Sequence, residues 1–127
     1  MIMPSRWFAG GKGLDSFRES MLSDKRISHI FDYVNAKDCF PTASIGGGVN
    51  YILWDVNYKG NCSITTIQGT QRDMEQRPLD QFSVFIRYNS AIHIVHKCQS
   101  DNSFASIVNS RNPFGLSSNI RGEKTGE

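Results

Sequence analysis

The sequence of 127 residues has no long apolar segment and little net charge. No apolar run approaches the ~20 residues that cross a bilayer. Residues 1–4 also lack the apolar core and the small-residue cleavage site of a signal peptide. We therefore expect a cytoplasmic protein without membrane contact. The formal net charge of +2, from 14 Lys and Arg against 12 Asp and Glu, is too small to hold a long polyanion by charge alone.

Cysteine is scarce, and no metal-ligating or catalytic pattern surrounds it. Cys39, Cys62 and Cys98 are odd in number and form no CxxC or CxxH motif, so we expect reduced thiols. His93 and His96 lie three residues apart, but no acidic or thiolate partner recurs with them, so we predict no metal site.

Three acidic residues, Asp32, Asp38 and Asp55, lie near predicted strand ends, where α/β enzymes place catalytic acids. The sequence pairs none of them with a second carboxylate, and it contains no GxSxG motif. We therefore predict no catalytic residue.

The pattern of apolar residues predicts alternating strands and helices. Strands are expected over residues 1–3, 27–34, 49–56 and 62–67. The third strand is apolar on both faces, which predicts burial on both sides. Residues 57–61 predict a hairpin turn, with the strand after it antiparallel to the strand before it. The recurrence of Leu14, Phe17, Met21 and Leu22 predicts an amphipathic helix.

The second half of the chain is expected to be less regular. Residues 69–78 are polar and predict a connector, whereas apolar residues at helical intervals predict a helix over residues 80–99. A short helix is expected over residues 104–109 and a mobile end over residues 121–127. A complete doubly wound α/β domain has more strands than these, so the chain is expected to be the second half of a larger α/β domain.

Several loop residues are candidates for binding. The loop at residues 10–13 has three glycines and a lysine, but it matches neither GxxxxGK[ST] nor GxGxxG, so it is either a plain connection or a loop near a nucleic-acid backbone. Arg6, Lys12, Arg111 and Arg121 stand beside aromatic residues or glycines in loops, where they either contact phosphate or are simply solvated. Residue type alone favours a buried Phe40, and the alternative is an exposed ring on which a base stacks.

Three stretches taken together resemble a known family. They are residues 1–18, residues 38–54 and residues 85–116. In this order and spacing they are similar to the adenine-specific DNA methyltransferases of restriction-modification systems, including the fused restriction-methylase enzymes.

The resemblance implies an α/β fold that is a partial Rossmann-like methyltransferase sheet, consisting of the last strands with an antiparallel hairpin, followed by C-terminal helices. Residues 1–68 would form the C-terminal half of the catalytic domain. Residues 69–127 would be a connector with a helix, leading towards an absent target-recognition domain. The parent enzymes use S-adenosylmethionine, but this sequence has neither their cofactor loop nor their Asn-Pro-Pro-Tyr/Phe motif. We therefore expect no cofactor binding and no methyl transfer by this chain alone.

The resemblance also implies where DNA would bind. Phe40 and Pro41 would pack on an adenine flipped out of the duplex, and Ile2 would line the same pocket. Arg6, Lys12 and Arg111 would approach the DNA. The implied function is a methyltransferase fragment that contributes the target-base pocket and the approach to double-stranded DNA.

The alternatives are a stand-alone or split-subunit nucleic-acid-binding or assembly module without catalysis, and a non-functional gene remnant. Partners other than DNA would be the missing N-terminal methyltransferase half or a second copy of the chain.

Overall fold

A computed structural model describes residues 1–100 and 107–108 of the chain. By its internal contacts the chain divides into two units, Met1–Lys97 and Cys98–Glu127. Nearly all described residues belong to the first unit. The helix predicted over residues 104–109, the mobile end predicted over residues 121–127, and Arg111 lie largely or wholly outside the described residues.

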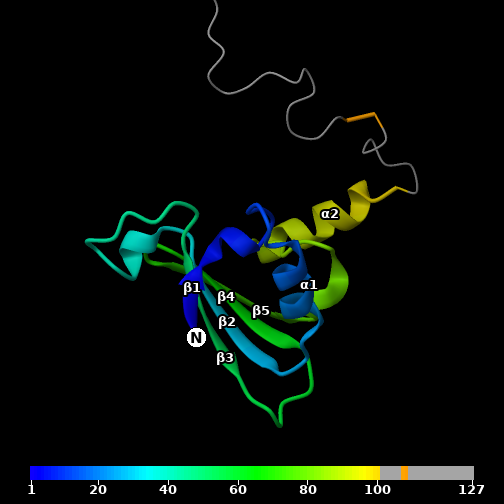
Figure 1. The fold of residues 1–127 in the computed structure, drawn as a ribbon, viewed down its shortest axis with the longest axis horizontal. Coiled ribbons are helices and arrows are strands. Elements are labelled where there is room, and N and C mark those ends of the chain that lie inside the picture. The colour runs from blue at the N-terminus through cyan, green and yellow to red at the C-terminus, as the bar shows by residue number, and fades with distance from the viewer. Residues whose placement is uncertain (101–106, 109–127) are drawn as a thin grey trace, which may run out of the picture. The chain divides into compact units, whose positions relative to one another are not determined.

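The first unit contains a mixed five-stranded sheet (Figure 1). Its strands are β1 (Ile2–Pro4), β2 (Ile27–Tyr33), β3 (Val49–Trp54), β4 (Cys62–Gln68) and β5 (Gln71–Arg77). The order across the sheet is β1-β3-β2-β4-β5. Strand β3 is antiparallel to both β1 and β2, strand β4 is parallel to β2, and β5 returns antiparallel to β4. The α/β class is therefore confirmed.

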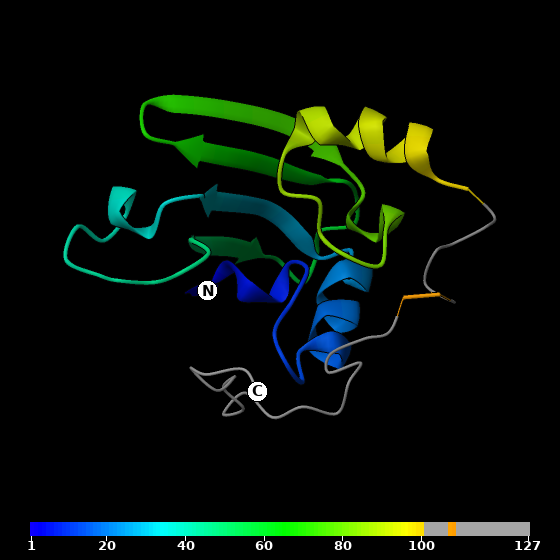
Figure 2. The same ribbon diagram turned by 90° about the horizontal axis from the view of Figure 1, so that it is seen from above.

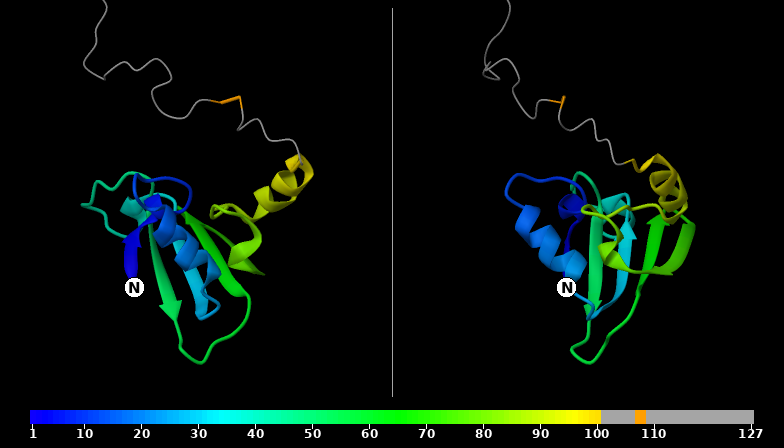
Figure 3. Two further views of the ribbon diagram at one scale, coloured as in Figure 1. Left: turned by 45° about the vertical axis from the view of Figure 1, so that its right-hand side comes forward. Right: turned by 90° about the vertical axis from the view of Figure 1, so that its right-hand side faces the viewer.

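One face of the sheet carries the hydrophobic core. Successive side chains of a strand point to opposite faces, so Ile30, Ile52 and Ile64, which are aligned across β2, β3 and β4, share one face. Leu22 of helix α1 (Asp15–Ser23) and Trp7 of the short helix η1 (Ser5–Trp7) pack into the same cluster. Figure 3 shows α1 against the strands in two views. The amphipathic pattern of residues 14–22 correctly predicted this helix.

The opposite face is only partly covered. Its rings are half-buried and contact one another: Phe31 lies 4.5 Å from Tyr51 between ring centroids, and Tyr33 lies 6.1 Å from Tyr51. Leu53 on β3 is 55% exposed. The prediction that this strand is buried on both sides is therefore wrong.

Strand β4 does not form a hairpin with β3. The predicted strand is present, but it is hydrogen-bonded in parallel to β2, which lies between β3 and β4. Residues 55–61 form a link longer than a two-residue hairpin turn, and they carry the chain past the first residues of β2. The predicted β3–β4 pairing is wrong, although the two strands do run in opposite directions.

The polar stretch at residues 69–78 is mostly strand β5 and not a connector. Every residue of β5 except Arg77 is exposed, because β5 is the last strand of the sheet. A division of the chain at residue 68 would separate β4 from β5, which are paired along their whole length.

The long helix predicted over residues 80–99 is largely absent. The chain instead forms two short 3-10 helices, η3 (Leu79–Gln81) and η4 (Asn89–Ala91), and a short helix α2 (Ile92–Cys98). Phe85 is buried in the irregular segment between them, where its backbone N–H donates to the Phe8 carbonyl at 2.7 Å. Its apolar character reflects a core contact and not a helix face. Among the described residues, no helix is long and apolar enough to span a membrane.

Candidate functional site at the carboxyl edge of the sheet

The carboxyl ends of three strands meet at one edge of the sheet. Strands β1, β2 and β4 run in the same direction, since β1 and β2 are both antiparallel to β3 and β4 is parallel to β2. The segments that leave this edge are η1, the long loop at residues 34–48, and the β4–β5 turn (Figure 2). In α/β proteins, ligands bind at the carboxyl ends of the strands.

A buried polar cluster lies under this edge. Asp32 at the end of β2 is fully buried, and its Oδ1 accepts a hydrogen bond of 2.8 Å from Ser5 Oγ. Asn50 Nδ2 donates to the same Ser5 hydroxyl at 3.1 Å. The Arg87 guanidinium closes the cluster as an ion pair, with 2.6 Å between its Nε and Asp32 Oδ2. Four segments far apart in the sequence are thereby held together.

The electrostatics of this cluster are dominated by burial. Burial raises the pKa of the Asp32 carboxyl, and the Arg87 charge and the Ser5 hydrogen bond oppose that rise. Arg87 also donates from Nη2 to the Gly47 carbonyl at 2.5 Å, so the ion pair anchors the glycine loop at residues 46–48. Gly48 has a φ of +83°, and a Cβ there would collide with the Tyr33 and Val34 carbonyls.

Phe40 and Pro41 lie in the long loop that follows β2. The loop begins with the short helix η2 (Ala36–Asp38), and the Phe40 N–H donates to the Ala36 carbonyl at 2.8 Å. Phe40 is 39% exposed, so the expectation of a buried ring, drawn from residue type alone, is wrong. Pro41 is also exposed.

Ile2 lies on β1, opposite Tyr51 of β3, and is 60% exposed. Burial and the neighbouring Tyr33 raise the pKa of Tyr51, and the nearby Cys39 thiol adds to that rise. Cys39 directly precedes Phe40. Tyr51 therefore pairs with Ile2 and interacts electrostatically with the residue before Phe40.

Arg6 and Lys12 are both exposed. Both line a largely apolar hollow of about 400 Å³ together with Met3 and Trp7. Neither side chain forms an ion pair among the described residues.

The acidic residues singled out in the sequence have separate partners. Asp38 Oδ2 accepts from the Gly69 N–H at 2.9 Å, and Asp55 Oδ1 accepts from the Asn57 N–H at 2.9 Å. Both carboxylates therefore stabilise turns. No group of three metal-ligating side chains comes together in the described part of the chain. The three cysteines are free thiols, and burial raises the pKa of Cys62 to about 12.

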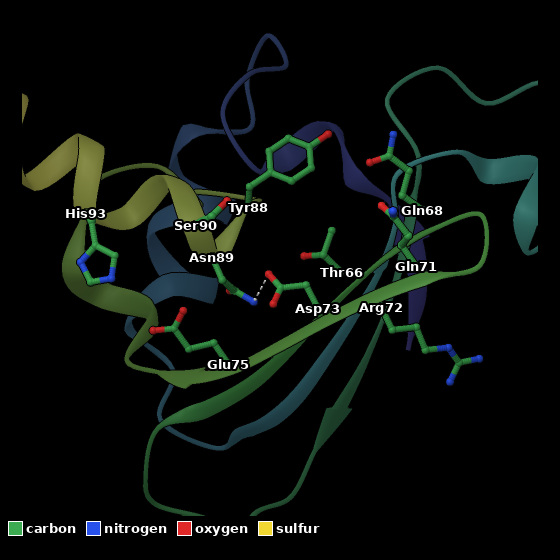
Figure 4. Close-up of a pocket in the computed structure, with 10 residues that line it drawn as sticks. All are labelled: Thr66, Gln68, Gln71, Arg72, Asp73, Glu75, Tyr88, Asn89, Ser90 and His93. Carbon is green, nitrogen blue, oxygen red and sulfur yellow. Dashed lines mark hydrogen bonds between the residues drawn. The ribbon is translucent and has the colours of Figure 1, made fainter.

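A second hollow, of about 630 Å³, lies between the β4–β5 hairpin and the segment from Tyr88 to His93 (Figure 4). Most of the residues that line it have polar side chains. Asp73 accepts a hydrogen bond of 3.0 Å from Asn89 Nδ2 across the hollow, and Asn89 is itself buried beside Arg77. Tyr88 adds a ring that is 45% exposed.

Two comparisons relate this chain to known proteins. Residues 1–40, which contain β1, α1, β2 and Phe40, match the model of the Eco57I restriction-modification methylase family. The chain is also 34% identical over 67 residues to a protein of Mycoplasma pneumoniae named as an uncharacterized adenine-specific methylase. The chain is related to restriction-modification adenine methylases over part of its length. The resemblance is thereby confirmed.

The similarity covers only part of this chain and only part of the relative. The match to the Mycoplasma pneumoniae methylase takes in 52% of this chain and 16% of that protein. The family model ends at residue 40, whereas the three stretches that suggested the methylases extend to residue 116. No solved structure matches the chain significantly.

Sequence reasoning missed the partners of Asp32. Arg87 and Ser5 are 55 and 27 residues away from it, and neither belongs to a recognisable motif with it. The only signal was the position of Asp32 near a strand end. The sequence did not indicate that Asn50 belongs to this cluster, because Asn50 lies inside an otherwise apolar strand.

Proposed function

We propose that this chain is the C-terminal part of the catalytic domain of an adenine-specific DNA methyltransferase from a restriction-modification system. Residues 1–68 would belong to the catalytic sheet, with β1, β2 and β3 as its last strands. Residues 69–127 would lead towards target recognition, with strand β5 at their start still paired to β4 at the edge of the sheet. The observation that carries the proposal is the methylase match over residues 1–40, which ends at Phe40.

The site we propose is a pocket for the target adenine. An adenine flipped out of a duplex loses the stacking free energy of its neighbours. Stacking on an exposed aromatic ring compensates for part of that loss. Phe40 is 39% exposed in the loop that leaves β2, and Ile2 is 60% exposed on β1. Ile2 pairs with Tyr51, and Cys39, the residue before Phe40, interacts electrostatically with the same tyrosine. We assign Phe40 and Pro41 to the stacking surface and Ile2 to an apolar wall.

Double-stranded DNA is the proposed partner, and S-adenosylmethionine is the proposed cofactor of the whole enzyme. Arg6 in η1 and Lys12 in the following loop are exposed cations and would contact phosphates. We place Arg111, which lies outside the described residues, in the same role. The chain has no Asn-Pro-Pro-Tyr/Phe motif to hold the adenine amino group. We therefore propose that methyl transfer requires the rest of the enzyme, and that this chain alone binds no cofactor.

The proposed function is tested by binding to a short duplex that contains one unpaired adenine. We expect the parent chain to bind this duplex more tightly than the fully paired duplex, and Phe40→Ala to reduce that preference. A stacked base is worth about 1–3 kcal/mol, so the loss is expected to be about 5- to 150-fold. Fluorescence anisotropy of a labelled duplex measures both affinities.

Phe17→Ala is the matched control. Phe17 has the same side chain and the same 39% exposure as Phe40, but it lies on α1. We expect it to leave the preference for unpaired adenine unchanged. Equal affinities of the parent chain and Phe40→Ala for the unpaired adenine would refute the pocket.

A further inference from the structure

The β4–β5 hairpin, which the sequence did not predict, ends beside the Phe40 loop. Gln68 pairs with Gln71, so only Gly69 and Thr70 form the turn. Gly69 adopts the left-handed conformation with a φ of +58°, as such short turns require. The Gly69 N–H donates to Asp38 Oδ2 at 2.9 Å. Asp38 is two residues before Phe40, so this bond ties the hairpin tip to the proposed base pocket.

The tip carries side chains that can hydrogen-bond to the base edges and the phosphates of DNA. The register places Gln68 and Gln71 on the helix-covered face, in line with Thr66 and Asp73, and it places Arg72 on the opposite face, in line with Ile67. Figure 4 shows Gln68 and Gln71 side by side, with the Arg72 guanidinium directed away from Asp73 and Glu75. The tip therefore offers two amides on one face and one guanidinium on the other.

These side chains are not bound to other described groups of the protein. Gln68, Gln71 and Arg72 are exposed, and no side-chain hydrogen bond or ion pair holds them within the described residues. By contrast, the guanidinium groups of Arg18, Arg77 and Arg87 are all bound to backbone or side-chain acceptors. Residues 68–72 themselves include no carboxylate, and the nearest ones are Asp38, bound to the Gly69 N–H, and Asp73.

The chemistry of the tip matches duplex DNA. A glutamine amide both donates and accepts, and so it can bind the edge of adenine in the major groove, where a two-stranded β-ribbon fits. An unpaired guanidinium binds phosphate or the guanine edge. An exposed strand that ends in amides, one cation and a short turn therefore has the shape and the donors of a groove-reading element.

We propose that the tip of the β4–β5 hairpin contacts the duplex beside the flipped adenine, with Gln68 and Gln71 on base edges and Arg72 on the backbone. This inference rests on the proposed function, because it takes DNA as the substrate. It adds a second contact element that neither the family match nor the resemblance assigns. The Asp38–Gly69 bond sets the distance between this element and Phe40.

The test compares two glutamines on the same strand. Gln71→Ala alters the tip, whereas Gln76→Ala alters another exposed glutamine towards the far end of β5. With the same short duplex that contains one unpaired adenine, we expect Gln71→Ala to bind about 5- to 150-fold more weakly. Gln76→Ala should bind like the parent chain. Both residues are exposed, so thermal unfolding should show unchanged stability for each variant.

Arg72→Ala tests the backbone contact separately. Each phosphate contact that is lost should reduce the slope of log affinity against log salt by about 0.9. The slope for Gln76→Ala should equal that of the parent chain. Parent-like affinity of Gln71→Ala, or equal losses for Gln71→Ala and Gln76→Ala, would overturn the proposal. An unchanged salt slope for Arg72→Ala would also overturn it.

The outcomes separate this inference from the proposed function. The tip variants should weaken binding to the paired and the unpaired duplex alike, whereas Phe40→Ala should reduce only the preference for unpaired adenine. A loss in the tip variants with none in Phe40→Ala would refute the base pocket and retain the hairpin contact. The reverse result would refute the hairpin contact alone.

Discussion

Replacing Arg87 with methionine would leave the Asp32 carboxylate without its cation inside the protein. The converse variant, Asp32→Asn, would leave the Arg87 cation without its carboxylate. The two changes are not equivalent, because the Asp32 side chain is 0% exposed and the Arg87 side chain is 21% exposed. A stranded guanidinium can still reach water and the Gly47 carbonyl, whereas a stranded carboxylate cannot reach water.

The expected magnitudes follow from this difference. Leaving a buried charge unpaired costs about 3–5 kcal/mol, and we expect this loss of unfolding free energy for Arg87→Met at pH 7. Asp32→Asn retains an acceptor for Ser5 Oγ and loses one charge-assisted interaction, so we expect a loss of no more than about 2 kcal/mol. The double variant removes both charges and should be more stable than Arg87→Met alone.

The pH dependence provides a second signature. Burial already raises the pKa of Asp32 above its ordinary 3.8, and removing Arg87 should raise it further. The folded state then keeps a proton that the unfolded state releases, so the stability of Arg87→Met should fall as the pH rises above 3.8. The double variant should lack this fall, because it has no carboxylate at this position.

Urea unfolding followed by tryptophan fluorescence, at pH 4.5 and at pH 7, measures these differences. Arg87→Lys keeps a positive charge and serves as a folded reference if Arg87→Met is too unstable to purify. A greater loss for Asp32→Asn than for Arg87→Met, or a pH-independent loss for Arg87→Met, would refute the reasoning about the buried ion pair.

Three further predictions concern the glycine loop, the thiols and catalysis. Gly48→Ala should lower the unfolding free energy by at least about 2 kcal/mol, because both its φ of +83° and its contact with backbone carbonyls exclude a Cβ. Gly46→Ala, which meets no atom within 4 Å, should change it by less than about 0.5 kcal/mol in the same denaturation assay. A thiol reagent at pH 8 should label the exposed Cys98 rapidly and Cys62 only on unfolding, because burial raises the pKa of Cys62 to about 12. Rapid labelling of Cys62 in the native protein would contradict its burial. The chain incubated with labelled S-adenosylmethionine and duplex DNA should give no labelled adenine, and detection of labelled adenine would refute the assignment as an incomplete catalytic domain.

The elements with a strong local pattern were predictable from the sequence. Helix α1 buries Leu22 from a regular apolar stripe, and β2 and β3 are rich in β-branched and aromatic residues. Strand β5 was not predictable in this way. It is exposed on both faces at the end of the sheet, so no apolar alternation marks it, and Gly69 at the turn was the only local signal.

The apolar spacing between Phe82 and Cys98 was misleading for a physical reason. Phe85 is buried because an irregular segment crosses the core and hydrogen-bonds to Phe8, and burial of this kind leaves the same spacing as a helix. Pairing between distant segments is also invisible in one sequence. The Asp32–Arg87 ion pair joins residues 55 positions apart, and neither residue type indicates the other.

The exposure of Phe40 illustrates what the resemblance added. Residue type favours a buried phenylalanine, since transfer of the ring from water is favourable. The resemblance to adenine methylases placed the ring at the surface, and the loop after β2 holds it 39% exposed. A ligand that stacks on the ring would account for the apolar surface left in water.

The central claim, that the carboxyl edge of this sheet receives an adenine beside Phe40, is tested most directly by nuclear magnetic resonance. Amide chemical shifts would be mapped while the chain is titrated with a short duplex that contains one unpaired adenine. We predict the largest shifts at Cys39, Phe40 and Ile2, with smaller ones at Arg6 and Lys12. Shifts confined to other parts of the chain, or the same shifts with a fully paired duplex, would contradict the account.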